Sequence, residues 1–222
     1  MLSNSELRFI FKYYGNKEKR GENMQKLKTE IRQRIIDVGK LRFKKEGYEN
    51  TSMKDIASDA GISIGNIYRY FLTKKHLLNE ILEEVEEEVK DFFEKLPSTY
   101  DEINIHHLFG MISDLTVKIA EEKNDTLKVM FNSQNESQFI EFKEKILNLF
   151  KDKMVTIAES MGTQKEMSSV LCEAIARAEF EGFTCIVKSN IDDISQLRKN
   201  LEIYQKLMIE NLGERVLEVM KK

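Results

Sequence analysis

Residues 63–71, SIGNIYRYF, bring together side chains that can recognise nucleic acid. Asn66 can pair through two hydrogen bonds with adenine, and Arg69 can pair in the same way with guanine. Tyr68 and Tyr70 can donate hydroxyl hydrogen bonds to phosphate oxygens while their rings pack on a sugar or a thymine methyl group. The stretch is too short and too polar to be a core helix, so these residue types predict a surface that touches DNA.

Helical spacing divides this stretch into two faces. Ile67 and Phe71 lie four residues apart, so they share a face and are expected to pack inward. Gly65 costs roughly 1 kcal/mol of helix propensity relative to alanine, and its missing side chain allows the backbone to approach DNA closely. The outward positions are Ile64, Gly65, Asn66, Arg69 and Tyr70, with Tyr68 at the margin.

Capping residues predict the helix that precedes this segment and the start of the segment itself. Upstream, TSMKDIASDAG predicts a helix that Ser52 caps, with Asp55 three residues later as a weak capping box and Gly61 at its end. The AGIS segment then joins it to the helix that Ser63 caps. Two short helices joined in this way predict a helix-turn-helix, whose second helix lies in the DNA major groove.

Two longer helices flank this pair. A helix over residues 26–45 ends at Gly47, and Thr73 caps the helix that follows the pair. Free N–H groups at the helix ends of Ser63 and Thr73 favour an anion, and Lys74 adds a full positive charge there. These residues are therefore expected to contact phosphate.

Four motifs follow one another along this part of the chain. They are F-x-x-x-G-Y at residues 43–48, I-A-x-x-A-G at 56–61, S-x-G-x-[LI]-Y-x-Y-F at 63–71 and F-x-x-K-x-x-L at 71–77. With them, residues 35–82 resemble the DNA-binding domain of TetR-family transcriptional regulators. Ile64 departs from the family pattern, which often has a basic or polar residue there, although isoleucine could meet a thymine methyl group.

The resemblance adds two contacts at the start of the second helix. It implies that Ser52 and Lys54 reach the DNA backbone or a neighbouring base edge, whereas Tyr48 is expected to pack in the core. The predicted DNA contacts are Ser52, Lys54, Ser63, Ile64, Gly65, Asn66, Tyr68, Arg69, Tyr70, Thr73 and Lys74.

Charge is distributed unevenly along the chain of 222 residues, whose net charge is −3. Residues 1–78 hold 17 basic and 9 acidic residues, a net charge of +8, and residues 79–222 hold 18 and 29, a net charge of −11. A basic front and an acidic body suggest that one end meets a polyanion, and the alternative is chance clustering on solvated helix faces.

Composition predicts an all-α fold. There is a single proline and there are ten glycines, and Leu, Ile, Glu and Lys recur with helical periodicity. The fold expected is an N-terminal three-helix DNA-binding domain containing the helix-turn-helix, over residues 24–72. A helical-bundle domain for effector binding and dimerisation follows over 73–222, with helices near 102–122, 136–160, 166–188 and 192–221 and a short helix around Leu127.

Residues 1–23 form a separate N-terminal extension without a clear helical period. The peptide KRGENM can be encoded by a string that places AGGAG shortly before an ATG codon. The hypothesis that follows is a natural start at Met24, and the alternative is a flexible basic arm that touches phosphate.

The family layout implies a small-molecule effector in the acidic body, but the residues do not identify it. Glu173, Glu179 or Glu181 could neutralise a cationic ligand if buried, with exposure on the surface as the alternative. Candidate pocket residues, each of which could instead be ordinary core, are Phe109, Met111, Met130, Phe131, Phe139, Phe142 and Cys172.

A homodimer through the last two long helices is also implied by the family layout. One side of residues 166–188 carries small residues that let another helix come close, and residues 192–221 show the three-and-four spacing of a bundle seam. Packing within one chain is the alternative. The candidate interface residues are Ala174, Ala178, Gly182, Cys185, Ile194, Leu197, Leu201, Tyr204 and Met208.

The sequence thus predicts a ligand-responsive regulator, most simply a repressor released by its effector from a palindromic operator of double-stranded DNA. A helical protein–protein adaptor without an effector is the alternative. An enzyme is not expected, because no phosphate loop, activated nucleophile or catalytic carboxylate cluster is present. No cofactor is expected, and adjacent His106 and His107 lack the spacing of a helical metal pair. No apolar run is long enough for a membrane span, and two cysteines without metal-type spacing favour the cytoplasm.

Overall fold

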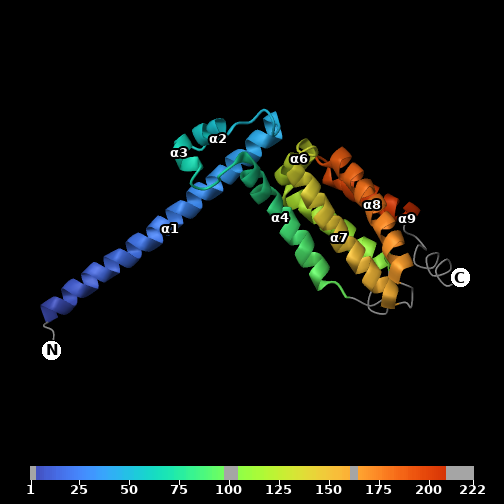
Figure 1. Ribbon diagram of the computed structural model, residues 1–222, viewed down its shortest axis with the longest axis horizontal. Helices are drawn as coiled ribbons and strands as arrows, with labels where there is room; N and C mark the ends of the chain where they lie inside the picture. The colour runs from blue at the N-terminus through green and yellow to red at the C-terminus, as the bar shows by residue number, and fades with distance from the viewer. Residues whose placement is uncertain (1–3, 98–104, 161–164, 209–222) are drawn as a thin grey trace.

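The computed structural model describes the backbone of residues 4–97, 105–160 and 165–208, and the side chains of residues 25–97, 107–160 and 169–208. Every regular element in these residues is a helix, and no strand occurs among them, as the composition predicts. In chain order (Figure 1) the helices are α1 (Asn4–Glu46), α2 (Met53–Asp59), α3 (Ile64–Ile67), α4 (Lys74–Lys95), α5 (Ile105–Glu122), α6 (Asn124–Asn132), α7 (Ser137–Ser160), α8 (Lys165–Asn190) and α9 (Ile194–Met208).

A small apolar core joins the C-terminal half of α1 to α2 and α3. Phe43 of α1, Ile56 of α2, and Ile67 and Phe71 from α3 and the turn after it are all fully buried. Ser52 caps α2 and forms the predicted capping box with Asp55. This core confirms the inward face predicted for the recognition segment.

Two glycines shape the turns around α2. Gly47, directly after α1, has a φ of 81°, and Gly61, between α2 and α3, has a φ of 67°. Both lie in the left-handed region, where a side chain costs energy and glycine does not. Gly47 therefore ends α1 and Gly61 ends the α2 segment, as the sequence predicts.

The remaining helices form a bundle that α4 shares with the N-terminal part. The helix α7 packs on α8 and α4, α9 packs on α5 and α8, and α4 also packs on α1. Figure 1 shows α4 leading from α1 into the bundle, with α2 and α3 beside the C-terminal half of α1 and away from α8 and α9.

Polar contacts also tie α1 to this bundle. Lys40 pairs with Glu84 of α4 at 2.6 Å, and Lys44 pairs with Asp125 of α6 at 2.8 Å. The Asn132 side chain at the other end of α6 donates to the backbone carbonyl of Lys44 at 3.0 Å. The end of α1 is therefore held by both ends of α6.

Two helix boundaries differ from the sequence-based expectations, and a third lies outside the described residues. The first helix, expected over residues 26–45, begins at Asn4, because the chain up to Gly47 contains no proline to stop helix propagation. The recognition helix ends at Ile67, and residues 68–70 continue as a turn with bonds from Arg69 N–H to Asn66 and from Tyr70 N–H to Ile67. Tighter bonds of this kind are common where a short helix ends. The part of the predicted last helix beyond residue 208 lies outside the described residues.

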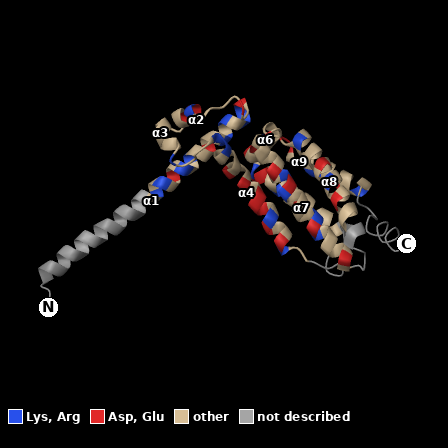
Figure 2. Cartoon of the chain, viewed as in Figure 1, with Lys and Arg blue, Asp and Glu red and all other residues tan. Residues whose placement is uncertain are grey.

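Charge follows the same division in space. Figure 2 shows basic residues (blue) on the described part of α1 and many acidic residues (red) on α4. None of the helices in the described residues is long and apolar enough to span a membrane.

Candidate nucleic-acid interface and internal cavity

The α2–α3 unit holds its outward face in a fixed position. The Ile62 N–H donates to Ala57 at 3.0 Å, which closes the turn between the two helices. The Ser63 hydroxyl accepts from the Asn66 N–H at 3.2 Å and so caps α3. Because Ile67 is fully buried below, the side chains on the opposite side of α3 can only face outward.

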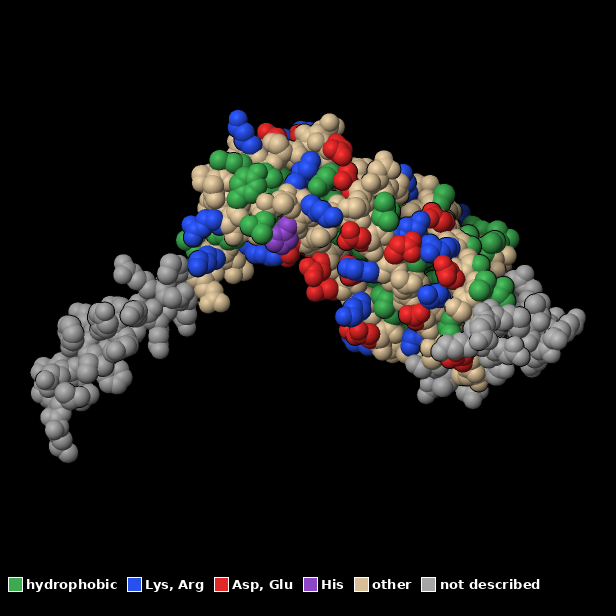
Figure 3. Space-filling view, in the orientation of Figure 1, with side chains coloured by type: hydrophobic (Ala, Val, Ile, Leu, Met, Phe, Trp, Pro, Cys, Tyr) green, Lys and Arg blue, Asp and Glu red, His purple; other side chains and the backbone are tan. Residues whose placement is uncertain are grey.

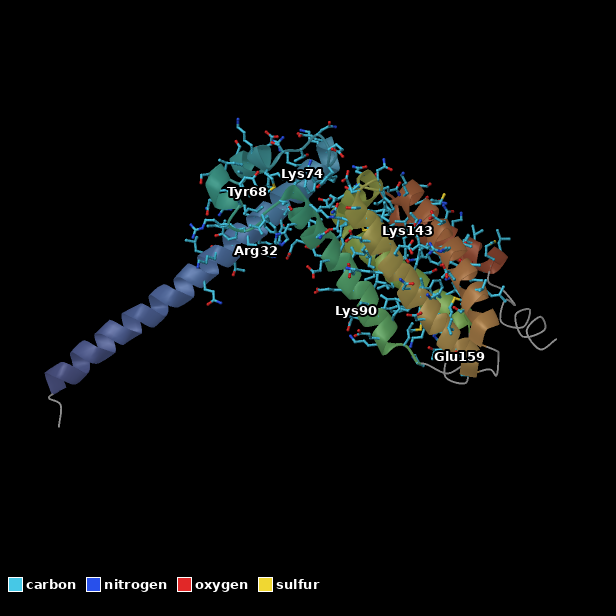
Figure 4. The ribbon with its side chains drawn as sticks, in the orientation of Figure 1. Arg32, Tyr68, Lys74, Lys90, Lys143 and Glu159 are labelled. Atoms are coloured by element: carbon cyan, nitrogen blue, oxygen red, sulfur yellow. The ribbon has the colours of Figure 1, made fainter. Side chains whose placement is uncertain are left out.

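The outward face has the composition expected of a DNA-reading surface. Ile64 and Tyr68 are 45% and 44% exposed, and Gly65 and Arg69 are also exposed. Asn66 and Tyr70 are half-buried, and Tyr70 packs partly on the core. Apart from the backbone bond of its N–H to Asn66, Arg69 makes no ion pair or hydrogen bond among the described residues, so its guanidinium is available to a partner. Figure 4 labels Tyr68 at this end of the molecule.

The hydroxyl groups of the three helix caps differ in whether their protons are free to donate a hydrogen bond. Ser63 and Thr73 each use an oxygen lone pair to accept a backbone N–H, so their hydroxyl protons remain available to a phosphate. Ser52 instead donates its hydroxyl to Asp55 while it accepts the Asp55 N–H. Its neighbour Lys54 is exposed. Contact through Ser52 would therefore require its capping box to open, whereas Lys54 can reach out directly.

The prediction that Lys74 contacts phosphate does not fit its position. Its ammonium donates to the backbone carbonyls of Tyr48 at 2.6 Å, Thr51 at 3.0 Å and Glu49 at 3.4 Å. It also lies 4.1 Å from the centroid of the Tyr48 ring. The cation of Lys74, which Figure 4 labels, thus fastens the start of α4 to the α1–α2 loop. Tyr48 packs on the core, as predicted.

One exposed residue beside α3 was missed by the sequence analysis. Leu72, directly after the recognition segment, is 74% exposed. Leu72 lies between the buried Phe71 and the exposed cap Thr73, so it belongs to the inward face of neither helix, which could have indicated its exposure. Figure 3 shows apolar side chains (green) on the surface at the α2–α3 end of the molecule.

The bundle encloses a cavity of about 150 Å³ between α4, α5, α6, α7 and α8. Its walls are almost entirely apolar, and they include four residues of the predicted pocket, namely Met130, Phe131, Phe139 and Phe142. Phe109, Met111 and Cys172 do not line it. Phe109 is fully buried against Phe150 at a centroid distance of 5.4 Å, so it supports the wall from behind. The lining residues that the sequence analysis missed include Phe150, Phe180 and Phe183.

Two of these phenylalanines could have been found from their spacing. Phe180 and Phe183 lie three residues apart on α8, and Val187 follows four residues later. All three line the cavity, which is the pattern of an inward helix face. The small residues predicted for a dimer seam lie on another face of the same helix.

A metal site does not form in the part of the molecule where side chains are described. No cluster of three or more His, Cys, Asp and Glu residues is placed there to hold an ion. Burial in apolar surroundings raises the pKa of the Cys172 thiol to about 11, which makes it a poor metal ligand and nucleophile near neutral pH.

Residues 35–81 match the family model of bacterial regulatory proteins, tetR family. The α2–α3 unit lies within this matched segment, so this part of the chain is similar to the tetR family of bacterial regulatory proteins. It is 37% identical over 49 residues to the HTH-type transcriptional regulator YfiR of Bacillus subtilis, covering 22% of this chain and 24% of that protein. It is 40% identical over 60 residues to an HTH-type transcriptional regulator of Staphylococcus aureus strain USA300, covering 27% of this chain and 32% of that protein. The chain therefore matches less than a third of the length of these curated relatives.

Solved structures of similar fold extend over most of the chain. The fatty acid degradation regulator FadR of Bacillus halodurans has a TM-score of 0.60 at 17% identity, covering 82% of this chain and 96% of that chain. A transcriptional regulator of Aquifex aeolicus has a TM-score of 0.56 at 24% identity, covering 81% and 99%. FadR of Bacillus subtilis, solved in complex with stearoyl-CoA, has a TM-score of 0.55 at 17% identity, covering 77% and 96%. At these identities the likeness concerns the fold.

The residues that the sequence predicts for a dimer interface fall into two groups. Leu197 and Leu201 are buried within their own chain, so these two are not available to a partner. Gly182 faces Tyr204 of the same chain, whose hydroxyl and ring occupy the space that a Cβ at residue 182 would need. The three-and-four spacing of α9 therefore reflects packing on α5 and α8 of its own chain, the alternative that the sequence left open.

A different part of the same two helices is open to solvent. Ala174, Ala178 and Cys185 of α8 are exposed, and Met208 of α9 is about half-exposed. Ile194 is partly buried against the core. Large apolar side chains near the predicted set are exposed as well: Val170, Leu171, Ile203 and Leu207. An interface on α8 and α9 would have to use these exposed positions.

Proposed function

We propose that this chain is a ligand-responsive transcriptional regulator that acts in the cytoplasm as a homodimer. In its simplest form it is a repressor that leaves a palindromic operator when a small molecule fills the cavity. Residues 24–72 would read DNA, and residues 73–222 would hold the effector and the dimer interface. The observation that carries the proposal is a rigid helix-turn-helix with a free Arg69, joined by α4 to the wall of an apolar cavity.

The DNA-reading part needs no rearrangement to approach a groove. The buried side chains below α3 fix the outward positions of Gly65 and Arg69, while the exposed Lys54 of α2 can reach the backbone. In a two-fold dimer, two such helices enter successive major grooves about 34–36 Å apart or at a multiple of that distance. A palindromic site follows from this symmetry.

Two helices can carry an effector signal from the cavity to this surface. Val85, Val89 and Phe93 of α4 line the cavity, and the start of α4 is fastened to the α1–α2 loop by Lys74. A ligand that shifts α4 would therefore displace α3 and the α1–α2 loop.

The second route runs through α6. Leu127, Met130 and Phe131 of α6 line the cavity, whereas Asp125 and Asn132 of the same helix hold the Lys44 end of α1. A ligand that pushes α6 outward would move this anchor. Shifting the population from mostly competent to mostly incompetent for DNA requires about 5.5 kcal/mol of differential affinity between the two forms.

The fold neighbour solved with stearoyl-CoA supports an effector in this kind of helical body. That complex belongs to FadR of Bacillus subtilis, which shares 17% identity with this chain. It shows that a protein of similar fold can hold a small molecule. The chemical class of an effector of this chain is inferred from the residues that line its own cavity.

The experiment that tests the proposal measures binding of the purified chain to DNA from upstream of its own gene by fluorescence anisotropy at several salt concentrations. We expect tight binding that weakens steeply with salt, because phosphate contacts release counterions. Arg69→Ala should lower the affinity, whereas Arg198→Ala, which removes an exposed arginine from α9, should not. Binding that ignores both salt and Arg69 would contradict the proposal and favour a helical adaptor.

A further inference from the structure

Among the residues that the structure describes, a single ionisable side chain lines the cavity. Among its described lining residues, Glu179 of α8 is the one acidic side chain, and none is Lys, Arg or His. The other polar lining residues are Thr116 and Thr184. Glu179 is only 5% exposed, so its carboxyl group lies inside the bundle and not on the surface.

This carboxyl group has an unmet need for a hydrogen-bond donor. The Tyr204 hydroxyl of α9 donates to it, but Glu179 Oε2 is buried without a hydrogen-bond partner. Burial raises the pKa of Glu179, and the bond from Tyr204 offsets part of that rise. A buried carboxylate is costly unless a donor or a cation compensates it, so the fold maintains this group at the expense of stability.

Neighbouring basic residues do not meet this need. Lys143 of α7 pairs with the exposed Glu181 and lies 5.5 Å from the centroid of the Phe180 ring, and Arg177 of α8 pairs with Glu144 and Glu173. Neither of these two basic residues is among those that line the cavity. The missing donor must therefore come from outside the described part of the chain.

We propose that the cavity binds a small lipophilic amine, whose ammonium group pairs with Glu179 and whose apolar body lies among the phenylalanine rings. The proposal rests on the proposed function for its regulatory meaning, since such a ligand would be the effector. Seven phenylalanines line the cavity, and aromatic faces attract cations. The volume of about 150 Å³ resembles that of an engineered cavity that holds benzene, so a single ring with a short amine arm is the right scale.

The same geometry disfavours an acidic ligand in this cavity. A carboxylate or phosphate would have to lie beside Glu179 without any lining Lys, Arg or His to neutralise it. Like charges in an apolar site repel strongly. A neutral ligand would fill the volume but leave the carboxyl oxygen without a cation.

Three probes of nearly equal size separate these cases. They are 2-phenylethylamine, which is cationic near neutral pH, 2-phenylethanol, which is neutral, and phenylacetate, which is anionic. Binding of each is measured by calorimetry at millimolar ligand on the wild-type chain, on Glu179→Gln and on Glu181→Gln. The last variant is the matched control, because it removes an exposed carboxylate two residues away on the same helix.

We expect the amine to bind the wild type and Glu181→Gln equally, and to bind Glu179→Gln about 10- to 100-fold more weakly. The alcohol should bind the wild type more weakly than the amine does, and should bind Glu179→Gln at least as well as the wild type. This second result shows that the variant keeps its fold and its cavity. Phenylacetate should bind the wild type most weakly of the three.

Three outcomes would overturn the proposal. They are the absence of saturable amine binding to the wild type, equal amine affinity in Glu179→Gln, and tighter binding of phenylacetate than of the amine. Each of these is read without DNA, so each can occur while the upstream DNA is bound with the expected salt dependence. Conversely, amine binding that depends on Glu179 in a chain that ignores DNA would refute the proposed function and leave the cavity assignment intact.

Discussion

Replacing Lys74 by methionine should destabilise the protein and not merely weaken its contact with DNA. Methionine keeps an unbranched side chain but removes the ammonium group that bridges the Tyr48 and Thr51 carbonyls at 2.6 and 3.0 Å. A hydrogen bond to a charged group contributes about 1.5–3 kcal/mol, and the ring of Tyr48 adds a cation–π contact. Because the bonds share one partly solvated cation, we expect a loss of about 2–4 kcal/mol of unfolding free energy.

The assay is urea unfolding followed by circular dichroism, with Lys75→Met as the matched control. Lys75 is the next residue, its side chain is 52% exposed, and its ammonium lies 3.8 Å from Glu141. Losing such a surface pair should cost within about 0.5 kcal/mol. A Lys74→Met protein as stable as the wild type, whose DNA binding loses about one unit of salt slope, would show that Lys74 contacts phosphate after all.

Three further predictions follow from the body of the protein. Burial raises the pKa of Glu179 in the folded state. At pH values above the pKa of an ordinary glutamate, the folded chain therefore binds more protons than the unfolded chain, and the free energy of unfolding falls as pH rises. Tyr204, with a pKa of about 12, stays neutral over this pH range. Glu179→Gln should therefore raise the free energy of unfolding near neutral pH by about 1–3 kcal/mol and change it little below about pH 4. Calorimetry would show this as a higher midpoint of thermal unfolding near neutral pH, and the opposite pattern would contradict the burial of this group. Leu207→Glu should convert a dimer to monomers in analytical ultracentrifugation without loss of helicity, since Leu207 is 77% exposed in the single chain; an intact dimer would place the interface elsewhere. Gly182→Ala should lower the unfolding midpoint in urea, because its Cβ would collide with the Tyr204 ring and hydroxyl; an unchanged midpoint would show that Tyr204 can move aside freely.

The helix-turn-helix could be predicted from the sequence because its determinants are local. The capping box of Ser52 and Asp55, the left-handed turn at Gly61, and the four-residue spacing of Ile67 and Phe71 each involve neighbours in the chain. Spacing and turn chemistry settle such features without reference to distant residues.

The surroundings of Lys74 and Glu179 could not be predicted from the sequence, because their partners are distant along the chain. The carbonyls that hold Lys74 belong to residues 48–51, more than twenty positions earlier. Glu179 was one of three glutamates considered on the same helix, and only the packing of α8 against α7 and α9 turns this one inward. A lysine or glutamate on a helix carries no local signal that says which way it faces a neighbouring element.

Two of the predicted interface residues, Leu197 and Leu201, are buried within their own chain for a related reason. The spacing of Leu197 and Leu201 predicts that this face of α9 is buried, which is correct. Periodicity alone does not distinguish burial against the same chain from burial against a second copy. The exposed Ile203 and Leu207 on another side of α9 became visible only once the intramolecular packing was known.

The most direct test of the central claim, that α3 reads a two-fold symmetric operator, is selection of bound DNA from a random pool by the wild type and by Arg69→Ala. The account predicts that the wild type enriches an inverted repeat, with half-sites a helical turn or a multiple of it apart. Arg69→Ala should then lose preference at one base pair in each half-site, at a cost of about 1–3 kcal/mol there, and keep the rest of the site. A pool without an inverted repeat, or identical preferences in the two proteins, would contradict the assignment of α3 as the reading helix.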